Sequence, residues 1–341
     1  MPRRRTGAGH GMAGARGPGD GATAHRRVVS HGGMALTPDT RDWLGRLAPV
    51  DVATLLYLAG ATGAVLAFTG EDHAGWDSLM VANALLLVLV LLAPRAREGG
   101  PVGRFLGDWY PMLLLGGLYA EVGVVNVDLG YQHDLAIQRL ELLVFGSQVS
   151  YRWIREMPSP VLSWLLHTCY LAYYAILYGS PLGLWFSGRR DPARRTIFAV
   201  MVTFYLCYVM FLFFPVAGPR YAFEQAHNAA TAVWPAQLTD RVLDLGDSWG
   251  AAFPSSHVAA AVVAALCALR YWRPLGLGLT PLTLGLIAAV VYGQFHYAVD
   301  ALAGLIVAGA VLASLRWAVS REQFAARPLP RRVWEAGPSR A

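Results

Sequence analysis

The segments Phe253-Pro254-Ser255-Ser256-His257 and Phe295-His296-Tyr297-Ala298-Val299-Asp300 each open an apolar stretch of the chain. If both stretches are helices, a histidine stands at the start of each. Helix N-termini carry unpaired backbone N–H groups and the positive end of the helix dipole, and both favour an anion. The two segments therefore predict a phosphate site built from two helix N-termini.

His296 and Asp300 are four residues apart, so on a helix they share one face. We expect the Asp300 carboxylate to accept a hydrogen bond from Nδ1–H of His296, which leaves Nε2 free as a nucleophile. His257 is then expected to be the proton donor. A single histidine beside an apolar run is more often a packing residue. Two of them, accompanied by a serine pair and an aspartate, favour a catalytic site.

These residues resemble the motifs of a known family. Pro254-Ser255-Ser256-His257 and His296-xxx-Asp300 are similar to PSGH and SRxxxxxHxxxD, two motifs of the phosphatidic acid phosphatase type 2 superfamily. Residues 214–221, Phe-Pro-Val-Ala-Gly-Pro-Arg-Tyr, resemble the segment before the first of these motifs in the inositol phosphorylceramide synthase-like (inositolphosphotransferase) branch. The resemblance covers about residues 108–319 and implies a six-helix membrane core that acts on lipid phosphates.

Two cationic groups of that family are missing from this chain. Its first motif, KxxxxxxRP, has no counterpart, since the chain contains no lysine. Val290 stands where the third motif has its arginine, a departure that the synthase-like branch shares. We therefore expect Arg220, together with Ser255 and Ser256, to bind the substrate phosphate.

The composition indicates a polytopic membrane protein. Of 341 residues, 55% are hydrophobic and 15% are charged, and several apolar runs approach the roughly 20 residues that span a bilayer. We predict an all-α fold of about eight transmembrane helices, of which the last six form the core of the family. The predicted spans are 52–69, 79–94, 110–127, 160–187, 196–216, 256–272, 277–294 and 298–319.

The arginines predict the orientation of the chain in the membrane. With the N-terminus inside, most of them fall in the tails and inner loops, as the positive-inside rule requires. The arginines in outward-facing loops are Arg139, Arg152, Arg155, Arg220 and Arg241. This topology predicts a multi-pass protein of the cell membrane with both termini in the cytoplasm. It also brings the two histidine segments to the outer face, because an even number of spans separates them.

We predict four parts along the chain. Residues 1–46, rich in Gly and Arg, are expected to form a disordered cytoplasmic tail, and residues 321–341 a second cytoplasmic tail. Residues 47–107 are expected to contribute two additional N-terminal helices. Residues 108–320 are expected to form the catalytic core.

Two segments between the predicted spans carry further signals. Residues 132–156 mix leucines with charged residues and are predicted to be an interfacial amphipathic helix or pair of helices. Residues 221–250 form a loop long enough to cover the site. Both are candidates for binding an acceptor or excluding water.

No cofactor and no metal are expected. The three cysteines lie inside apolar runs at unrelated spacings, which favours neither disulfides nor a zinc site, and the motifs hold no carboxylate cluster of the kind that binds Mg²⁺. The net charge of +6 follows from membrane topology and does not indicate a nucleic-acid partner. The expected partner is a membrane lipid substrate. The sequence carries no signal for the oligomeric state.

Together these features predict a lipid phosphotransferase that moves a phospho-head group between lipids, or onto an alcohol, through a phosphohistidine at His296. A lipid phosphate phosphatase with water as the acceptor is the alternative among enzymes. A transporter is the alternative of another class, because Glu121 and His167 lie within predicted spans. The ionisable residues gather at one surface and the spans show no paired helix breaks, which argues against a transporter.

Overall fold

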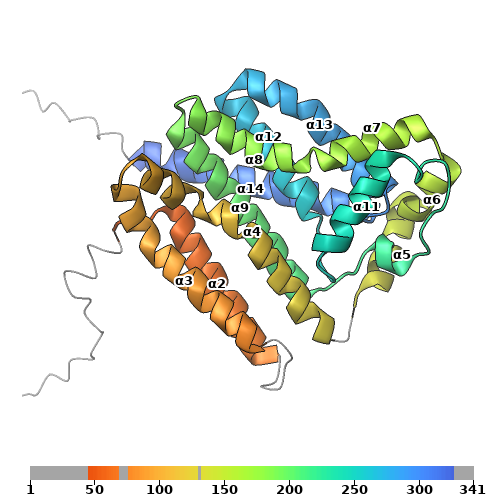
Figure 1. The fold of residues 1–341 in the computed structure, drawn as a ribbon, viewed down its shortest axis with the longest axis horizontal. Coiled ribbons are helices and arrows are strands. Elements are labelled where there is room, and N and C mark those ends of the chain that lie inside the picture. The colour runs from red at the N-terminus through yellow and green to blue at the C-terminus, as the bar shows by residue number, and fades with distance from the viewer. Residues whose placement is uncertain (1–44, 69–75, 130–131, 326–341) are drawn as a thin grey trace, which may run out of the picture. The chain divides into compact units, whose positions relative to one another are not determined.

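The computed structural model describes residues 45–68, 76–129 and 132–325, and its regular elements in these ranges are helices (Figure 1). The predicted N-terminal tail and most of the predicted C-terminal tail lie outside the described residues. The helices are α2 (Pro49–Phe68), α3 (Trp76–Glu98), α4 (Pro101–Leu129), α5 (Asp134–Phe145), α6 (Val149–Glu156), α7 (Pro160–Leu171), α8 (Tyr173–Phe186), α9 (Arg190–Phe213), α10 (Pro219–Ala222), α11 (Trp234–Gly246), α12 (Ser256–Tyr271), α13 (Arg273–Tyr292) and α14 (Ala298–Ala325).

The predicted spans correspond to α2, α3, α4, the pair α7 and α8, α9, α12, α13 and α14. Within the described ranges, four of these helices are long and apolar enough to cross a membrane: α3, α9, α13 and α14. The pair α7 and α8 makes a fifth candidate, bent by 41° at Ala172, and α12 is a shorter apolar helix. The all-α membrane fold is confirmed, although fewer helices than the predicted eight meet this criterion.

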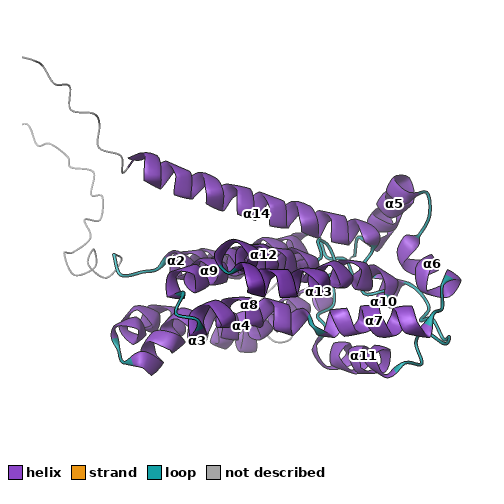
Figure 2. Cartoon of the chain, turned by 90° about the horizontal axis from the view of Figure 1, so that it is seen from above, coloured by secondary structure: helices purple, strands orange, loops and turns teal. Residues whose placement is uncertain are grey.

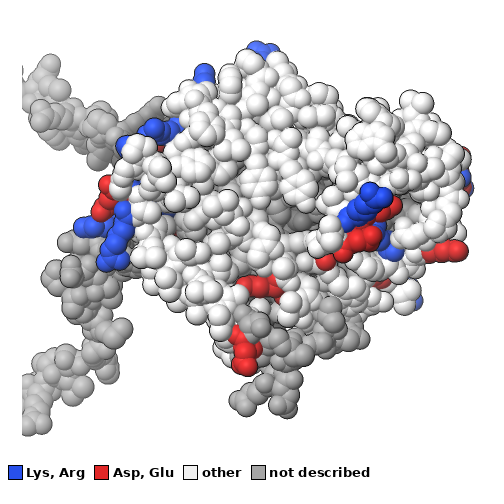
Figure 3. Space-filling model, in the orientation of Figure 1, with Lys and Arg blue, Asp and Glu red and all other residues white. Residues whose placement is uncertain are grey.

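Large apolar side chains cover the outside of the helices, as a protein in lipid requires. Leu56, Leu113 and Ile306 are 69%, 64% and 71% exposed. Charged side chains gather mainly towards the ends of the helices, with a broad uncharged band between them (Figure 3). Such a surface is unfavourable in water, so it indicates that this band faces the hydrocarbon of a bilayer.

Helix α12 lies at the centre of the core and packs against α8, α9, α13 and α14. Its alanines from Ala259 to Ala268 are buried, and such small side chains let neighbouring helices approach closely. Helix α14 crosses the bundle against it (Figure 2). At that crossing, a Cβ atom on Gly304 would lie 2.6 Å from the carbonyl oxygen of Ser255. Glycine at 304 therefore allows the N-terminal parts of α12 and α14 to meet.

The first two helices are joined to the core by a buried ion-pair network. The Arg97 guanidinium on α3 donates to both Asp51 carboxylate oxygens on α2, at 2.5 and 2.7 Å, and to Asp108 on α4 at 3.1 Å. Arg194 on α9 donates to the second oxygen of Asp108 at 2.7 Å. Removing one partner from such a network leaves an uncompensated buried charge, so it holds α2 and α3 in place.

The segment predicted to be one or two amphipathic helices forms two, α5 and α6. In α5 the two acidic side chains point inward, since Asp134 and Glu141 are 3% and 0% exposed, while Leu135 and Leu143 are 68% and 82% exposed. The exposed apolar face suits a position at the membrane interface. The buried carboxylates support the site described next.

Candidate active site

Two loops at the site are connected through their backbones, and the side chain of Asp134 on α5 holds one of them. Val216 and Ala251 form an isolated parallel bridge, in which the Ala252 N–H donates to the Val216 carbonyl at 2.9 Å. Gly218 has φ of +95°, a conformation that L side chains rarely adopt. The carboxylate of Asp134 accepts the N–H groups of Ala217 and Gly218 at 2.8 and 2.9 Å. This arrangement fixes the loop that ends at Arg220.

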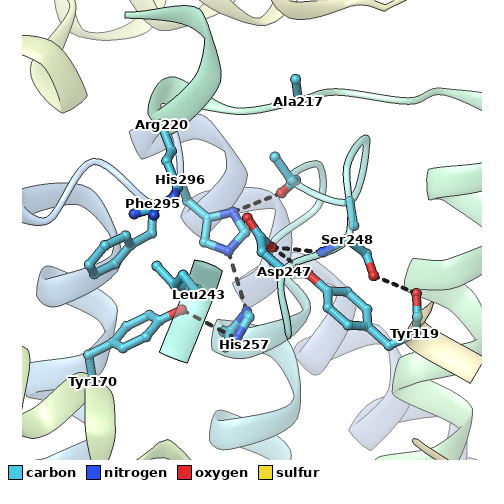
Figure 4. Close-up of a pocket in the computed structure, with 12 residues that line it drawn as sticks. Tyr119, Tyr170, Ala217, Arg220, Leu243, Asp247, Ser248, His257, Phe295 and His296 are labelled. Atoms are coloured by element: carbon cyan, nitrogen blue, oxygen red, sulfur yellow. Dashed lines mark hydrogen bonds between the residues drawn. The ribbon is translucent and has the colours of Figure 1, made fainter. Parts of the chain in front are cut away.

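His296 follows α13 and is 4% exposed. Its Nδ1 lies 2.9 Å from the Ala252 carbonyl oxygen, so Nδ1–H donates to the backbone and the lone pair of Nε2 remains available (Figure 4). We expected Asp300 to accept this hydrogen, but its Oδ2 is farther away, at 3.6 Å. The bridge between residues 216 and 251 explains the difference, because it places the Ala252 carbonyl beside the imidazole. The Asp300 carboxyl group still lies next to the ring.

His257, in the first turn of α12, faces His296 across the site. Its Nδ1 is 3.5 Å from Nε2 of His296, and its Nε2 is 3.5 Å from the hydroxyl oxygen of Tyr170. The rings of Tyr170 and Tyr173 pack on the imidazole at centroid distances of 5.6 and 4.5 Å. The two histidines thus occupy fixed positions within reach of one phosphoryl group.

Asp300 and Ser255 hold the starts of α14 and α12 together. Asp300 is fully buried, and its Oδ2 accepts the N–H of Tyr297 at 2.8 Å, as an acidic residue does in a helix capping box. Ser255 is the N-cap of α12, where its hydroxyl oxygen accepts the N–H of Val258 at 3.3 Å, and its own N–H donates to the Asp300 carbonyl at 3.0 Å. Ser256 is 2% exposed and begins the helix.

Arg220 lies beside the histidines, but its guanidinium has carboxylate partners. It donates to Asp240 at 2.9 Å and to Asp244 at 2.5 Å, both on α11. Burial lowers the pKa of Arg220, yet the hydrogen bonds and charges of the two carboxylates outweigh burial and raise that pKa overall. The predicted phosphate-binding arginine is therefore in the expected place and is paired within the chain.

Two pockets meet at this site. The inner pocket, of about 20 Å³, is lined by both histidines and has room for about one water molecule. The outer pocket, of about 600 Å³, is covered by α11. Arg220, Leu243 and Asp247 line both pockets and so form the boundary between them. The segment 221–250 was expected to be a loop that covers the site, but it contains the helix α11, which supplies part of the wall.

Several residues around the site were not predicted from the sequence. Asp247 accepts hydrogen bonds from the hydroxyls of Tyr119 and Tyr221, each at 3.0 Å, and burial followed by the Asp247 charge raises the pKa of Tyr221 to about 12. Asp134 supports the Arg220 loop and also accepts the Tyr297 hydroxyl at 2.9 Å. Their only sequence signal is that carboxylates occur in the two segments between spans, which does not assign them to a site.

Val290, which replaces an arginine of the related motif, lies inside the core. Its side chain is fully buried, and its carbonyl oxygen accepts the N–H groups of Phe295 and His296 at 3.0 and 2.9 Å. The position thus shapes the turn that carries His296. Among the described residues, no group of three or more His, Cys, Asp or Glu side chains has the arrangement of a metal site.

Comparison with known families gives one match. Residues 136–314, which run from α5 into α14, match the family model described as the PAP2 superfamily. The searches of curated proteins and of solved structures gave no significant match. The matched range includes every predicted site residue.

Proposed function

The chain belongs to the PAP2 superfamily of membrane phosphatases and phosphotransferases, and we propose that it is a lipid phosphotransferase working through a phosphohistidine. This proposal rests on the pair of histidines, in which Nε2 of His296 lies 3.5 Å from Nδ1 of His257 and Nδ1–H of His296 donates to a backbone carbonyl. In the first step, Nε2 of His296 attacks phosphorus and the bond to the leaving oxygen breaks. His257 gives that oxygen its proton.

In the second step an acceptor hydroxyl attacks the phosphohistidine. The new P–O bond forms, the P–N bond breaks and returns its electron pair to Nε2, and His257 takes the hydroxyl proton. Asp300 and the Ala252 carbonyl keep His296 in one tautomer and stabilise the positive charge of the phosphoimidazole. The first step leaves His257 without its proton, so that it can take the proton of the acceptor hydroxyl in the second step. The second step returns both histidines to their starting states.

We assign the binding of the non-bridging oxygens to Arg220, the Ser255 hydroxyl and the backbone N–H groups that open α12. The two carboxylates that hold Arg220 are 48% and 68% exposed, while the Arg220 side chain is 16% exposed, so the carboxylates have room to turn towards solvent. A phosphate oxygen can therefore replace them. A single arginine flanked by carboxylates suits the one negative charge of a phosphodiester better than the two of a phosphomonoester.

The neighbouring outer pocket supports transfer to an alcohol, because it offers space for an acceptor beside the histidines. Phosphatase action is the alternative, and the inner pocket favours it, since that pocket has room for about one water molecule. We place transfer first because one arginine flanked by carboxylates suits a phosphodiester donor, and because the outer pocket is large enough for an alcohol acceptor.

Product analysis separates the two activities. We expect the purified protein in detergent, given a labelled phospholipid and an alcohol acceptor, to form the phosphorylated acceptor in preference to free phosphate or free head-group phosphate. Mass spectrometry identifies the products with and without the acceptor. Release of phosphate at one unchanged rate under both conditions, with no transfer product, would refute transfer and leave a lipid phosphatase.

We further propose that the site faces outward in the cell membrane with both termini in the cytoplasm, a proposal supported by the distribution of arginines. Ala229 and Ser187 are both exposed and belong to loops on opposite sides in this topology, while the native cysteines are buried. An Ala229→Cys variant should react with an impermeant maleimide on intact cells, and a Ser187→Cys variant should react only after lysis. The reverse pattern would place the site in the cytoplasm.

A further inference from the structure

The outer pocket has the size of a small-molecule site and is enclosed by several chain segments. Its volume of about 600 Å³ lies within the usual range of roughly 300–1,000 Å³ for ligand pockets. Its walls come from α7, α10, α11 and the turn after α13. The proposed transfer reaction uses the histidines of the inner pocket and places an acceptor in this larger space without defining its chemistry.

Gln294 is the strongest indication that something polar binds there. The residue lines the outer pocket and is 2% exposed, yet among the described residues its Nε2 has no hydrogen-bond partner. Buried donors are nearly always paired in folded proteins. The backbone of Gln294 is also in the left-handed region, with φ of +60°, and strained residues of this kind gather at functional sites. We infer that a ligand atom accepts from this amide.

The other polar groups of the pocket define what that ligand is. Asp240, Asp244 and Asp247 line one wall, and although the first two are paired with Arg220, their carboxylates keep further acceptor sites. His167 also lines the pocket and donates Nδ1–H to the Ser163 carbonyl at 2.9 Å, so its Nε2 is an acceptor. The carboxylate and imidazole acceptors therefore line the same space as the amide donor of Gln294.

This mixture of acceptors and a donor favours hydroxyl groups over charged groups. A hydroxyl both donates and accepts, so neighbouring hydroxyls satisfy carboxylates and an amide N–H at once. An ammonium group only donates and would leave Gln294 unpaired. A phosphate only accepts and would be repelled by three carboxylates.

We propose that the outer pocket binds a neutral, hydroxyl-rich molecule or head group as the acceptor of the transferred phosphoryl group. This inference rests on the proposed function, which supplies the donor and the phosphohistidine. Gln294 and the carboxylates of α11 determine specificity, and Asp247, which lines both pockets, directs one hydroxyl towards the histidines. The hydroxyls belong either to a free polyol or to the head group of a neutral glycolipid.

The test compares acceptors in the purified full-length protein. A free hexitol, mixed micelles carrying a neutral glycolipid, and a short alcohol with one hydroxyl are offered with the same labelled phospholipid. We expect a lower KM for the hydroxyl-rich acceptors than for the simple alcohol. The Gln294→Met variant, which keeps the chain length and removes the donor, should raise that KM by about tenfold, the value of roughly one hydrogen bond.

Two further variants control this result. Gln237→Met makes the same change on an exposed part of α11 that lines neither pocket, and the hydroxyl-rich KM should stay within twofold. Gln294→Glu replaces the donor with an acceptor of equal size, so it should also raise the KM if Gln294→Met fails to fold. Equal KM values for the hydroxyl-rich acceptors and the simple alcohol would overturn the inference. An unchanged KM for the hydroxyl-rich acceptors in Gln294→Glu would also overturn it.

Direct binding separates this inference from the proposed function. Isothermal titration of the hexitol and of the glycolipid micelles into the His296→Ala variant measures the pocket without turnover and shows which source of hydroxyls it takes. We expect binding that Gln294→Glu weakens in the same background. If the protein binds the hydroxyl-rich molecule in this way but releases only phosphate, the inference about the outer pocket stands and the proposed transfer is refuted. If the protein catalyses transfer but its binding of the acceptor does not depend on Gln294, the inference about the outer pocket is overturned.

Discussion

Replacing His296 with alanine is expected to lower kcat by about 10⁴-fold or more, while the protein still folds. The imidazole is the proposed nucleophile, and without it the phosphohistidine intermediate does not form. The measurement is turnover of a labelled phospholipid by the purified variant, together with thermal unfolding in the same detergent. Unfolding at the wild-type temperature would show that the loss belongs to the chemistry.

A trapping experiment tests the role of His296 by detecting the phosphohistidine intermediate itself. Rapid acid-free quenching of the wild-type protein with a substrate labelled at phosphorus should leave label on the chain that is stable to base and lost in acid, as a phosphohistidine is. The His296→Ala variant should carry no such label. Wild-type turnover in that variant, or label that persists in it, would exclude His296 as the nucleophile.

Replacing His257 with alanine is expected to lower kcat by about 10²- to 10⁴-fold for a substrate with an alkyl leaving group. The proposed role of His257 is to protonate the leaving oxygen, and an alkoxide leaves poorly without a proton. A nitrophenyl leaving group needs no proton, so with such a substrate the loss should shrink to about tenfold or less. The measurement is the ratio of the two rates in the wild type and the variant.

Tyr170 provides the matched control, because its hydroxyl is 3.5 Å from Nε2 of His257 and is the other group that could move a proton there. Tyr170→Phe keeps the ring that packs on the imidazole. We expect it to lower the rate with the alkyl substrate much less than His257→Ala does. Equal losses for both leaving groups in His257→Ala would mean that this histidine acts by packing and not by proton transfer.

Much of the fold follows from local patterns that the sequence displays. Apolar runs of span length predict the membrane helices, because burying apolar surface in lipid depends on composition and length alone. The span predicted over 256–272 corresponds to α12, which the structure places at Ser256–Tyr271. The even number of spans between His257 and His296 predicts that they meet, and they lie 3.5 Å apart. Their catalytic roles stay predictions.

The hydrogen-bond and ion-pair partners of the site residues could not be predicted from the sequence. Local spacing predicted Asp300 as the acceptor of His296 Nδ1–H, but a carbonyl 44 residues away is closer, because a bridge between two loops brings it there. Arg220 was predicted to be free for phosphate, but α11 presents two carboxylates to it. Neither pairing has a sequence signal, since each joins segments whose approach depends on how the helices pack.

The sequence by itself predicted the helices of the membrane spans and the candidate residues for the chemistry, but it did not predict α11. These properties depend on hydrophobicity and on spacing within about one helical turn. The tertiary structure alone decided the position of Gln294, whose Nε2 has no partner among the described residues, the placing of Asp247 between two pockets, and the support of the Arg220 loop by Asp134. These features depend on distances between segments far apart in the chain, and such distances follow from the packing of the whole core.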